Sequence, residues 1–232
     1  MKSIIITGAS SGIGRATAEK FLAEGWRVGL IARRADLLAE IAEGQSRAVV
    51  LPADVTDETA MAQAFDTFGE LDVLFNNAGM FGPSAPIDEI AVADWEKVLM
   101  VNLHGMFLAA RLAFGRMRAQ GRGGRIINNG SISAHTPRPG SVCYTTTKHA
   151  ITGLTKSLSL DGRDFDIACG QIDIGNAETD MVAELKTRSP ETYTMDVRHA
   201  VEAVVHMARL PKEANVLFMT VMANRMPFVG RG

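Results

Sequence analysis

Tyr144 and Lys148 lie four residues apart, shortly after Pro139 and Gly140, where a helix can begin. Residues i and i+4 share one face of a helix, so the phenol and the ammonium would be neighbours. A nearby cation favours tyrosinate, so Lys148 should lower the pKa of Tyr144 from its ordinary value of about 10. The pair could then exchange a proton with an alcohol or a carbonyl, while Ser131 held the same oxygen. The alternative is an ordinary amphipathic helix, because Tyr-x-x-x-Lys is a common pattern.

Composition indicates a globular protein with a hydrophobic core. The 232 residues, 47% hydrophobic and 22% charged, suit a single domain over residues 1–232. The net charge is -2 and basic residues form no block, so nucleic acids and anionic membranes are poor candidates for partners. Cys143 and Cys169 form no Cys-x-x-Cys pair, which argues against a metal or disulfide framework. We expect a cytoplasmic protein, because we find neither a secretory signal nor an apolar run of about 18 residues.

Short apolar runs alternate with amphipathic segments along the chain. The apolar runs predict strands at residues 4–6, 27–32, 48–51, 72–75, 125–127, 167–172 and 216–221. Helices are expected at residues 15–24, 37–42, 57–69, 92–117 (with a break near 102), 144–160 and 197–208. This alternation implies parallel strands joined by right-handed crossovers. We therefore predict an α/β fold with one doubly wound Rossmann-type domain, whose mostly or wholly parallel seven-stranded sheet has helices on both faces.

A glycine-rich turn follows the first strand, in the sequence Thr7-Gly8-Ala-Ser-Ser-Gly12-Ile-Gly14. A strand, a glycine turn and a helix form the arrangement in which backbone N–H groups hold a pyrophosphate. Gly8 would permit the tight turn, while Gly12 and Gly14 would let the backbone approach a ligand and the helix pack close to the strand. The alternative is a turn without a ligand, because the spacing G-x-x-x-G-x-G differs from the G-x-G-x-x-G fingerprint.

The end of the second strand should select the cofactor. The acidic residue that would bind an adenosine ribose is replaced by Ala32, and Arg33 and Arg34 follow it. An arginine fork suits the 2′-phosphate of NADP(H), which we therefore favour, with NAD(H) as the alternative. We assign this phosphate contact to Arg33. We interpret Arg34 as a residue that solvates the start of the next helix.

Polar residues also follow the third and fourth strands. Asp54 and Val55 come after the third strand, and Asp54 could accept from an adenine amine or cap the next helix, although Asp57 is the better cap. The fourth strand leads into Asn76-Asn77-Ala78-Gly79, which either shapes a cofactor groove or forms a turn held by side-chain amides. Because ligands of parallel sheets bind at the carboxyl ends of the strands, we expect the site at this edge.

Asn102 lies in an otherwise apolar segment, so its amide must find hydrogen-bond partners. One interpretation is a structural hydrogen bond to the backbone. The other is a bound water that connects Asn102 to Lys148.

The motifs together resemble those of the classical short-chain dehydrogenase/reductase family, over Ile4 to about Thr220. Thr7-Gly-x-x-x-Gly-Ile-Gly14 is similar to the cofactor loop of that family, and Asn76-Asn-Ala-Gly79 to its sheet-supporting motif. Its four catalytic positions are matched in order by Asn102, Ser131, Tyr144 and Lys148. The resemblance implies direct hydride transfer between a nicotinamide and a substrate carbon.

The resemblance also implies a role for each residue. Tyr144 would be the general acid in reduction and the base in oxidation, with Ser131 polarising the substrate oxygen. Lys148 would lower the pKa of Tyr144 and hold the nicotinamide ribose, and Asn102 would support a water linked to Lys148. No metal is implied. The residues expected to bind the cofactor are Gly8, Ser10, Ser11, Gly12, Ile13, Gly14, Arg33, Asp54, Val55, Asn76, Ala78, Gly79, Tyr144, Lys148, Gly175 and Thr179.

Several features depart from the family pattern. Ile174 replaces the usual proline before Gly175, and Gly170 stands where the family commonly has asparagine. The substrate lid, expected around residues 176–194, is brief, and the tail lacks the usual glycine-rich ending, which argues against the common tetramer. We expect a homodimer paired through the helices from Asn102 and Tyr144, with a homotetramer as the alternative.

The substrate is less well defined by the sequence. We expect an apolar pocket, which favours a small or medium hydrophobic carbonyl, and we interpret His135 as a loop residue rather than a second base. The predicted function is an NADP(H)-dependent oxidoreductase of carbonyls and secondary alcohols, with reduction favoured. One alternative is a sensor or scaffold that binds NADP(H) without turnover; another, a nucleotide-sugar epimerase or dehydratase, usually carries a larger C-terminal domain. The expected pocket residues are Phe81, Ser133, Ala134, His135, Cys143 and Met181.

Overall fold

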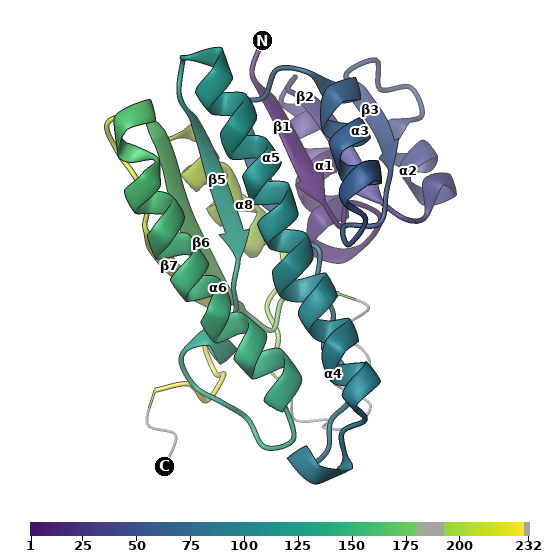
Figure 1. The fold of residues 1–232 in the computed structure, drawn as a ribbon, viewed down its shortest axis with the longest axis vertical. Coiled ribbons are helices and arrows are strands. Elements are labelled where there is room, and N and C mark those ends of the chain that lie inside the picture. Colours follow the sequence, from purple (N-terminus) through teal and green to yellow (C-terminus); the bar gives the residue numbers. More distant parts are fainter. Residues whose placement is uncertain (180–181, 183–192, 230–232) are drawn as a thin grey trace.

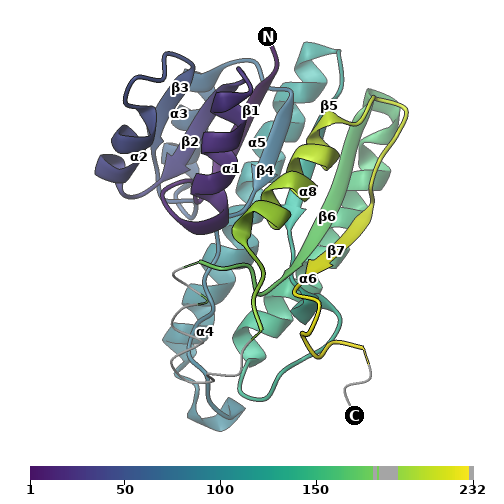
Figure 2. The same cartoon turned by 180° about the vertical axis from the view of Figure 1, so that it is seen from behind.

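The fold is built on one parallel sheet. The computed structural model describes residues 1–179, 182 and 193–229. Within these residues, seven strands pair in the order β3-β2-β1-β4-β5-β6-β7, all parallel (Figures 1 and 2). The predicted fold class is confirmed. The strands are β1 (Ser3–Thr7), β2 (Arg27–Ala32), β3 (Ala48–Pro52), β4 (Val73–Asn76), β5 (Gly124–Asn129), β6 (Ile167–Gly175) and β7 (Phe218–Met222).

Helices cover both faces of the sheet. Figure 2 shows α1 and α8 in front of the sheet, whereas Figure 1 shows α5 and α6 in front of the opposite face. The α-helices are α1 (Gly12–Ala23), α2 (Ala35–Ala42), α3 (Glu58–Phe68), α4 (Val92–Leu99), α5 (Gly105–Gln120), α6 (Val142–Asp161) and α8 (Val197–Arg209). Short 3₁₀ turns are η1 (Ile87–Glu89), η3 (Ile132–Ala134) and η4 (Arg163–Phe165).

Successive residues of β1 contribute to two apolar cores, one on each face. Ile4 and Ile6 belong to the same core as Phe21 of α1, whereas Ile5 belongs to the core that contains Phe65 of α3. All five side chains are buried. Each buried side chain of this size stabilises the fold by about 1.5–3 kcal/mol. The alternation of side chains along β1 therefore anchors the strand that leads into the glycine-rich turn.

Strand β6 is longer than the apolar pattern predicts. The prediction ends at residue 172, but β6 continues through Asp173 and Ile174 to Gly175. The extension pairs with β7, at Asp173 with Thr220 and at Ile174 with Val221. An aspartate interrupts the apolar run, so the continuation depends on pairing with a strand that is remote in sequence.

The segment between β4 and β5 contains a π-helical turn. Helix α4 leads into this turn at Met100–His104, and α5 follows it. Asn102 lies within the turn, where the sequence predicts a break. By length and composition alone, Val92–Gln120 is the one helix of the described residues that could cross a membrane. In this fold, its α5 part packs against α3, β4 and β5, as a core helix does.

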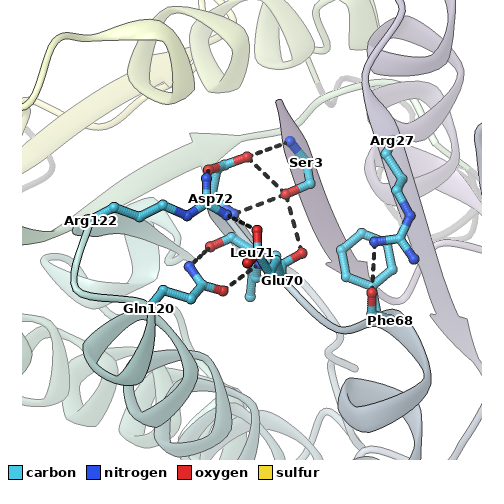
Figure 3. Close-up of polar contacts among 8 residues, drawn as sticks. All are labelled: Ser3, Arg27, Phe68, Glu70, Leu71, Asp72, Gln120 and Arg122. Carbon is cyan, nitrogen blue, oxygen red and sulfur yellow. Dashed lines mark hydrogen bonds and ion pairs between the residues drawn. The ribbon is translucent and has the colours of Figure 1, made fainter. Parts of the chain in front are cut away.

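A polar cluster closes the amino ends of β1 and β4 (Figure 3). The Asp72 carboxylate accepts hydrogen bonds from the backbone N–H and the hydroxyl of Ser3, both at 2.8 Å. Arg122 donates to the other oxygen of Asp72 at 2.7 Å, and Gln120 exchanges two hydrogen bonds with the backbone of Leu71. Because these groups satisfy one another's hydrogen bonding, we interpret the cluster as structural.

Candidate active site

A cavity of about 430 Å³ lies at the carboxyl ends of the strands. Its volume falls within the roughly 300–1,000 Å³ that is usual for ligand pockets. Of the residues expected to carry the reaction or contact the substrate, it is lined by Phe81, Ser131, Ser133, Tyr144 and Lys148. Of the remaining residues expected to bind the cofactor, it is lined by Gly8, Ser10, Ser11, Gly12, Ile13, Arg33, Asp54, Val55, Ala78, Gly79, Gly175 and Thr179.

Hydrogen bonds connect the carboxyl ends of the neighbouring strands β1, β4 and β5 beneath the cavity. The Thr7 hydroxyl, at the end of β1, accepts from the backbone N–H groups of Asn77 (2.8 Å) and Ala78 (3.0 Å). The Asn77 amide donates to the Thr7 carbonyl at 3.0 Å and accepts from the Asn129 side chain, at the end of β5, at 2.8 Å. The turn after β4 is therefore held by side-chain amides, as one of the two interpretations predicts, and Asn77, Ala78 and Gly79 also line the cavity.

The glycine-rich turn leaves no room for side chains. Gly8 has a φ of +69°, and a Cβ on it would lie 2.9 Å from the Cα of Ala78. Gly14 does not line the cavity; a Cβ on it would overlap the carbonyl oxygen of Gly8. Gly8 thus permits the turn, and Gly14 lets α1 pack against it.

The N-terminus of α1 points its backbone donors toward the cavity without a side-chain cap. Ser11 is the N-cap residue, but its side chain makes no capping hydrogen bond. Its hydroxyl instead accepts from Arg34 at 3.0 Å, and the Ser10 hydroxyl accepts from the same guanidinium at 2.8 Å. Uncapped N–H groups beside an arginine suit an anion such as a dinucleotide phosphate, so the residues present fit the expected cofactor.

The interpretation of Arg34 as a merely solvating residue is wrong. Its guanidinium bridges two hydroxyls of the glycine-rich turn, and both Arg33 and Arg34 line the cavity. The sequence alone could not show this, because the turn and Arg34 are separated by a whole helix and strand.

Asp54 lies at the same end of the cavity as Arg33. Burial tends to raise the pKa of its carboxyl, but hydrogen bonds from the Thr56 backbone and hydroxyl and the charge of Arg33 bring the pKa below its usual value. The distances from Thr56 are 2.9 and 2.8 Å. Asp57, not Asp54, caps α3, by accepting from the backbone N–H of Ala60 at 3.0 Å. Asp54 is therefore an ionised side chain in the cavity wall rather than a cap.

Ser131, Tyr144 and Lys148 converge at the other end of the cavity. Ser131 and Tyr144 both line this end, close enough for the Ser131 hydroxyl to lower the pKa of Tyr144. The Lys148 ammonium lies 5.4 Å from the centroid of the Tyr144 ring and donates to the Asn129 carbonyl at 2.7 Å. The ring of Phe81 packs edge-on against Tyr144, with centroids 4.9 Å apart. A hydroxyl, a phenol and an ammonium therefore share one small apolar-walled space.

The pKa of Tyr144 is raised, not lowered as we expect from the sequence. Burial is the largest cause, and the hydrogen bond with Ser131 and the charge of Arg138 oppose it. Lys148 lies beside the ring and is bonded to Asn129 rather than to the phenol oxygen. Burial also lowers the pKa of Lys148 to about 8.

Two expected site residues lie behind the cavity wall. Asn102 is fully buried and exchanges two hydrogen bonds with the backbone of Met80, at 2.8 and 2.9 Å. Asn76 is also buried and donates to the Met106 carbonyl at 2.7 Å. Neither side chain lines the cavity. Asn102 therefore shows the structural bonding that we considered for it, and Asn77 rather than Asn76 faces the cavity.

A comparison with known protein families shows the family to which the chain belongs. A family profile described as short chain dehydrogenase matches residues 2–190, which is most of the chain. The chain belongs to the short-chain dehydrogenase family. As a member of this family, it is an oxidoreductase that acts on alcohols or carbonyls.

Other members of the family resemble the chain over most of its length. It is 39% identical over 188 residues to 2-(R)-hydroxypropyl-CoM dehydrogenase of Xanthobacter autotrophicus. The aligned region covers 76% of this chain and 75% of that protein. It is 34% identical over 194 residues to NADP-dependent (R)-specific alcohol dehydrogenase of Lentilactobacillus kefiri, with coverage of 80% and 77%. The closed form of serine dehydrogenase complexed with NADP+ has the same fold, with a TM-score of 0.89, 23% identity and 94% of each chain covered.

Three residues expected in the substrate pocket of this short-chain dehydrogenase lie outside the cavity lining, and a fourth cannot be placed. Cys143 is buried against Gly82, and a Cβ on that glycine would lie 3.7 Å from the Cβ of Cys143. His135 turns to Asp173, with 2.7 Å between its Nε2 and Oδ2 of the carboxylate. Ala134, which directly precedes His135, is buried. Met181 lies outside the described residues.

Several residues that the sequence pattern does not assign to the site line the cavity or stand directly behind it. Asn77 and Asn129 line it, as do Lys97 and Arg138. Asp173 stands behind Ser131, at the carboxyl end of β6. The strand-end argument that led to Asp54 applies equally to Asn129 and Asp173. Lys97 and Arg138 lie on α4 and a loop, where no sequence pattern marks them.

Proposed function

We propose that this short-chain dehydrogenase transfers a hydride between NADP(H) and a carbonyl or secondary alcohol, with reduction as the favoured direction. One observation carries the proposal. The side chains of Ser131, Tyr144 and Lys148 meet in the same cavity that the glycine-rich turn and the N-terminus of α1 enter from the opposite end. A dinucleotide that lies along this cavity would present its phosphates to α1 and its reactive ring to Tyr144.

Tyr144 acts as the general acid in this proposal. Because burial raises its pKa, the phenol keeps its proton at neutral pH and can donate it to a carbonyl oxygen. The Ser131 hydroxyl binds the same oxygen and polarises the carbonyl. When bound, NADPH supplies the hydride. In the reverse direction, Tyr144 would have to lose its proton first, which its raised pKa disfavours.

Lys148 holds the cofactor and neutralises charge near Tyr144. With a pKa of about 8, its ammonium is mostly protonated at neutral pH. It is buried and fixed by the Asn129 carbonyl, so it would meet the ribose hydroxyls of the cofactor without losing rotamer freedom. Asn102 holds the segment around Met80 in place and acts on the site through the backbone.

The preference for NADP(H) rests on a cluster formed by Arg33 and Arg34, which follow β2, with Ser10 and Ser11 of the glycine-rich turn after β1. Two arginines and two hydroxyls supply the donors that a 2′-phosphate accepts, and Ala32 removes the carboxylate that would repel it. A relative that is 34% identical is named as NADP-dependent, which supports the same choice.

The substrate pocket combines an apolar wall with positive charge. Phe81 forms the wall beside Tyr144, and the Arg138 guanidinium lies 5.8 Å from the Phe81 ring centroid. Lys97 also lines the cavity. We propose a carbonyl with an apolar body, and we give preference to those that carry a carboxylate or sulfonate for Arg138 to bind. This modifies the purely hydrophobic substrate that the sequence predicts.

We also propose that the chain forms a single domain with a short lid around residues 176–194, most of which lie outside the described residues, and that it acts in the cytoplasm. Cys143 and Cys169 are both buried and unpaired, which is typical of a reducing compartment.

The test is a panel of neutral, carboxylated and sulfonated ketones and aldehydes, followed by the loss of NADPH absorbance. We expect turnover of at least one carbonyl. Tyr144→Phe should bind NADPH as the parent does but reduce kcat by about 100-fold or more, because general acid catalysis contributes 10²–10⁴-fold. A Tyr144→Phe variant with a near-normal rate would refute the proton-transfer role. Binding of NADPH with no turnover of any carbonyl would favour the sensor or scaffold alternative.

A further inference from the structure

Asp173 is a fully buried carboxylate that stands directly behind Ser131. Its Oδ1 accepts the backbone N–H of Ser131 at 2.9 Å and the side-chain amide of Gln171 at 2.7 Å. The chain passes so close that a Cβ on Gly130 would overlap Oδ1. A carboxylate is costly to bury unless its oxygens are paired, so these bonds hold it firmly in one place.

His135 completes the hydrogen bonding of Asp173 from the solvent side. Its Nε2 lies 2.7 Å from Oδ2 of Asp173, and its side chain is 40% exposed. The ring also packs against Phe228, with centroids 6.3 Å apart. In this part of the structure, the imidazole therefore lies between the carboxylate and water.

Asp173 also acts on the two titratable groups of the proposed reaction. Its negative charge raises the pKa of Tyr144, in addition to the larger effect of burial, and raises the pKa of Lys148 against the effect of burial. Within the described residues, the titratable groups that interact with Asp173 are His135, on the loop after η3, and Tyr144 and Lys148, on α6. Arg138, on the loop before α6, acts on Tyr144 with the opposite sign.

We propose that Asp173 is a positioning residue of the active site: its carboxylate, held by His135, fixes the backbone of Ser131 and supplies the negative charge that faces Tyr144 and Lys148. The contact with Ser131 is through a backbone N–H, which cannot pass a proton onward under these conditions. Asp173 and His135 therefore set the geometry and the charge of the site without taking part in the proton transfer itself.

The inference rests on the proposed role of Tyr144, but its decisive test needs neither substrate nor cofactor. The sequence contains two tyrosines, Tyr144 and Tyr193, so Tyr193→Phe leaves Tyr144 as the single tyrosine. The tyrosinate absorbance of this variant is followed as the pH rises. Asp173→Asn is then added, because asparagine keeps the shape and the acceptor oxygen for Ser131 while it removes the charge.

We expect Asp173→Asn to move the titration midpoint of Tyr144 to lower pH, since a neighbouring anion no longer opposes tyrosinate. His135→Ala retains the charge of Asp173, so the midpoint should stay close to that of the parent. Asp161→Asn is the matched control: the same charge is removed from the exposed far end of α6, about 25 Å along the helix from Tyr144. It should leave the midpoint unchanged.

The positioning role is tested by kinetics once a substrate is known. Asp173→Ala and the smaller change Asp173→Ser leave the Ser131 N–H without its acceptor, so kcat should fall by about tenfold or more. Asp173→Asn should restore most of that rate at its own pH optimum. If the parent protein reduces no carbonyl, the proposed function is refuted. The titration of Tyr144 would still test the charge of Asp173, because it needs no substrate.

Two results would overturn the inference. One is an unchanged midpoint in Asp173→Asn with the fold retained by circular dichroism. The other is failure of all three Asp173 variants to fold, which would make the carboxylate a requirement of folding rather than of the site.

Discussion

At the scale of single residues, the Tyr144 hydroxyl is subject to opposing influences. Burial and the charge of Asp173 raise its pKa, whereas the Ser131 hydrogen bond and the Arg138 charge lower it. The burial effect exceeds the others, so the phenol keeps its proton at neutral pH, as the proposed role of a general acid requires. A Tyr-x-x-x-Lys pattern predicts the neighbours correctly but not this balance, because burial depends on the whole fold.

A residue-scale prediction concerns the choice of cofactor. Arg34→Ala should weaken the binding of NADPH by about tenfold or more, because a charge-assisted hydrogen bond to the 2′-phosphate is lost. The binding of NADH, which lacks that phosphate, should change little. Both constants can be measured by titration of the cofactor fluorescence, with Arg116→Ala on the far surface of α5 as the control.

Ala32→Asp tests the same site from the other side. The new carboxylate would repel the 2′-phosphate and accept from a ribose hydroxyl, so the preference should move toward NADH. Equal weakening of NADPH and NADH in Arg34→Ala, or a parent protein that already prefers NADH, would contradict the NADP(H) assignment.

At the scale of elements, the site depends on how closely α1 approaches β1 and the turn after β4. Gly14 lets the first turn of α1 lie against the Gly8 carbonyl, and Thr7 holds the turn after β4 with two hydrogen bonds. The glycine spacing correctly predicts this strand–turn–helix unit. The sequence does not show which glycine faces the cavity and which serves packing, because both have the same local pattern.

Gly14→Ala should therefore damage this unit. A methyl group would overlap the Gly8 carbonyl, so we expect a loss of stability of about 1–3 kcal/mol or more together with loss of NADPH binding. Chemical denaturation and cofactor titration would measure the two effects.

Gly153→Ala in the exposed surface of α6 is the matched control. A Cβ there meets no atom within 4 Å, so stability should be unchanged or rise by up to ~1 kcal/mol. A Gly14→Ala variant as stable as this control, with normal cofactor binding, would disprove the packing argument.

At the scale of the whole molecule, an apolar surface on α4, α5 and α6 suggests an assembly. Leu99, Leu103, His104 and Leu154 line a shallow hollow there together with the exposed side chains of Met100 and Phe107. Apolar patches of this kind on a protein surface commonly mark an interface. We propose that a second copy of the chain covers it around a two-fold axis, as the sequence predicts for the helices from Asn102 and Tyr144.

Phe107→Glu should shift the protein from a dimer to a monomer in size-exclusion chromatography with light scattering, because a charge would be buried at the interface. Ile87→Glu, at an exposed apolar position of η1, is the control and should leave the assembly unchanged. A Phe107→Glu protein of unchanged mass would place the interface elsewhere, and a parent of four copies would favour the tetramer.

The sequence by itself determined the alternation of strands and helices, the glycine-rich turn, and the set Ser131, Tyr144 and Lys148. These features depend on local periodicity and short spacings, which act over a few residues of chain. The class of fold and the general site could therefore be predicted without coordinates.

Only the tertiary structure decided which of the polar residues reach the cavity. Arg34 donates to the Ser10 hydroxyl although α1 and β2 separate the two residues in the sequence. His135, which follows β5 and η3, contacts Asp173 near the carboxyl end of β6. Burial raises the pKa of Tyr144 for the same reason. Such contacts join residues that are far apart in sequence, so they follow from the packing of the chain and not from any local pattern.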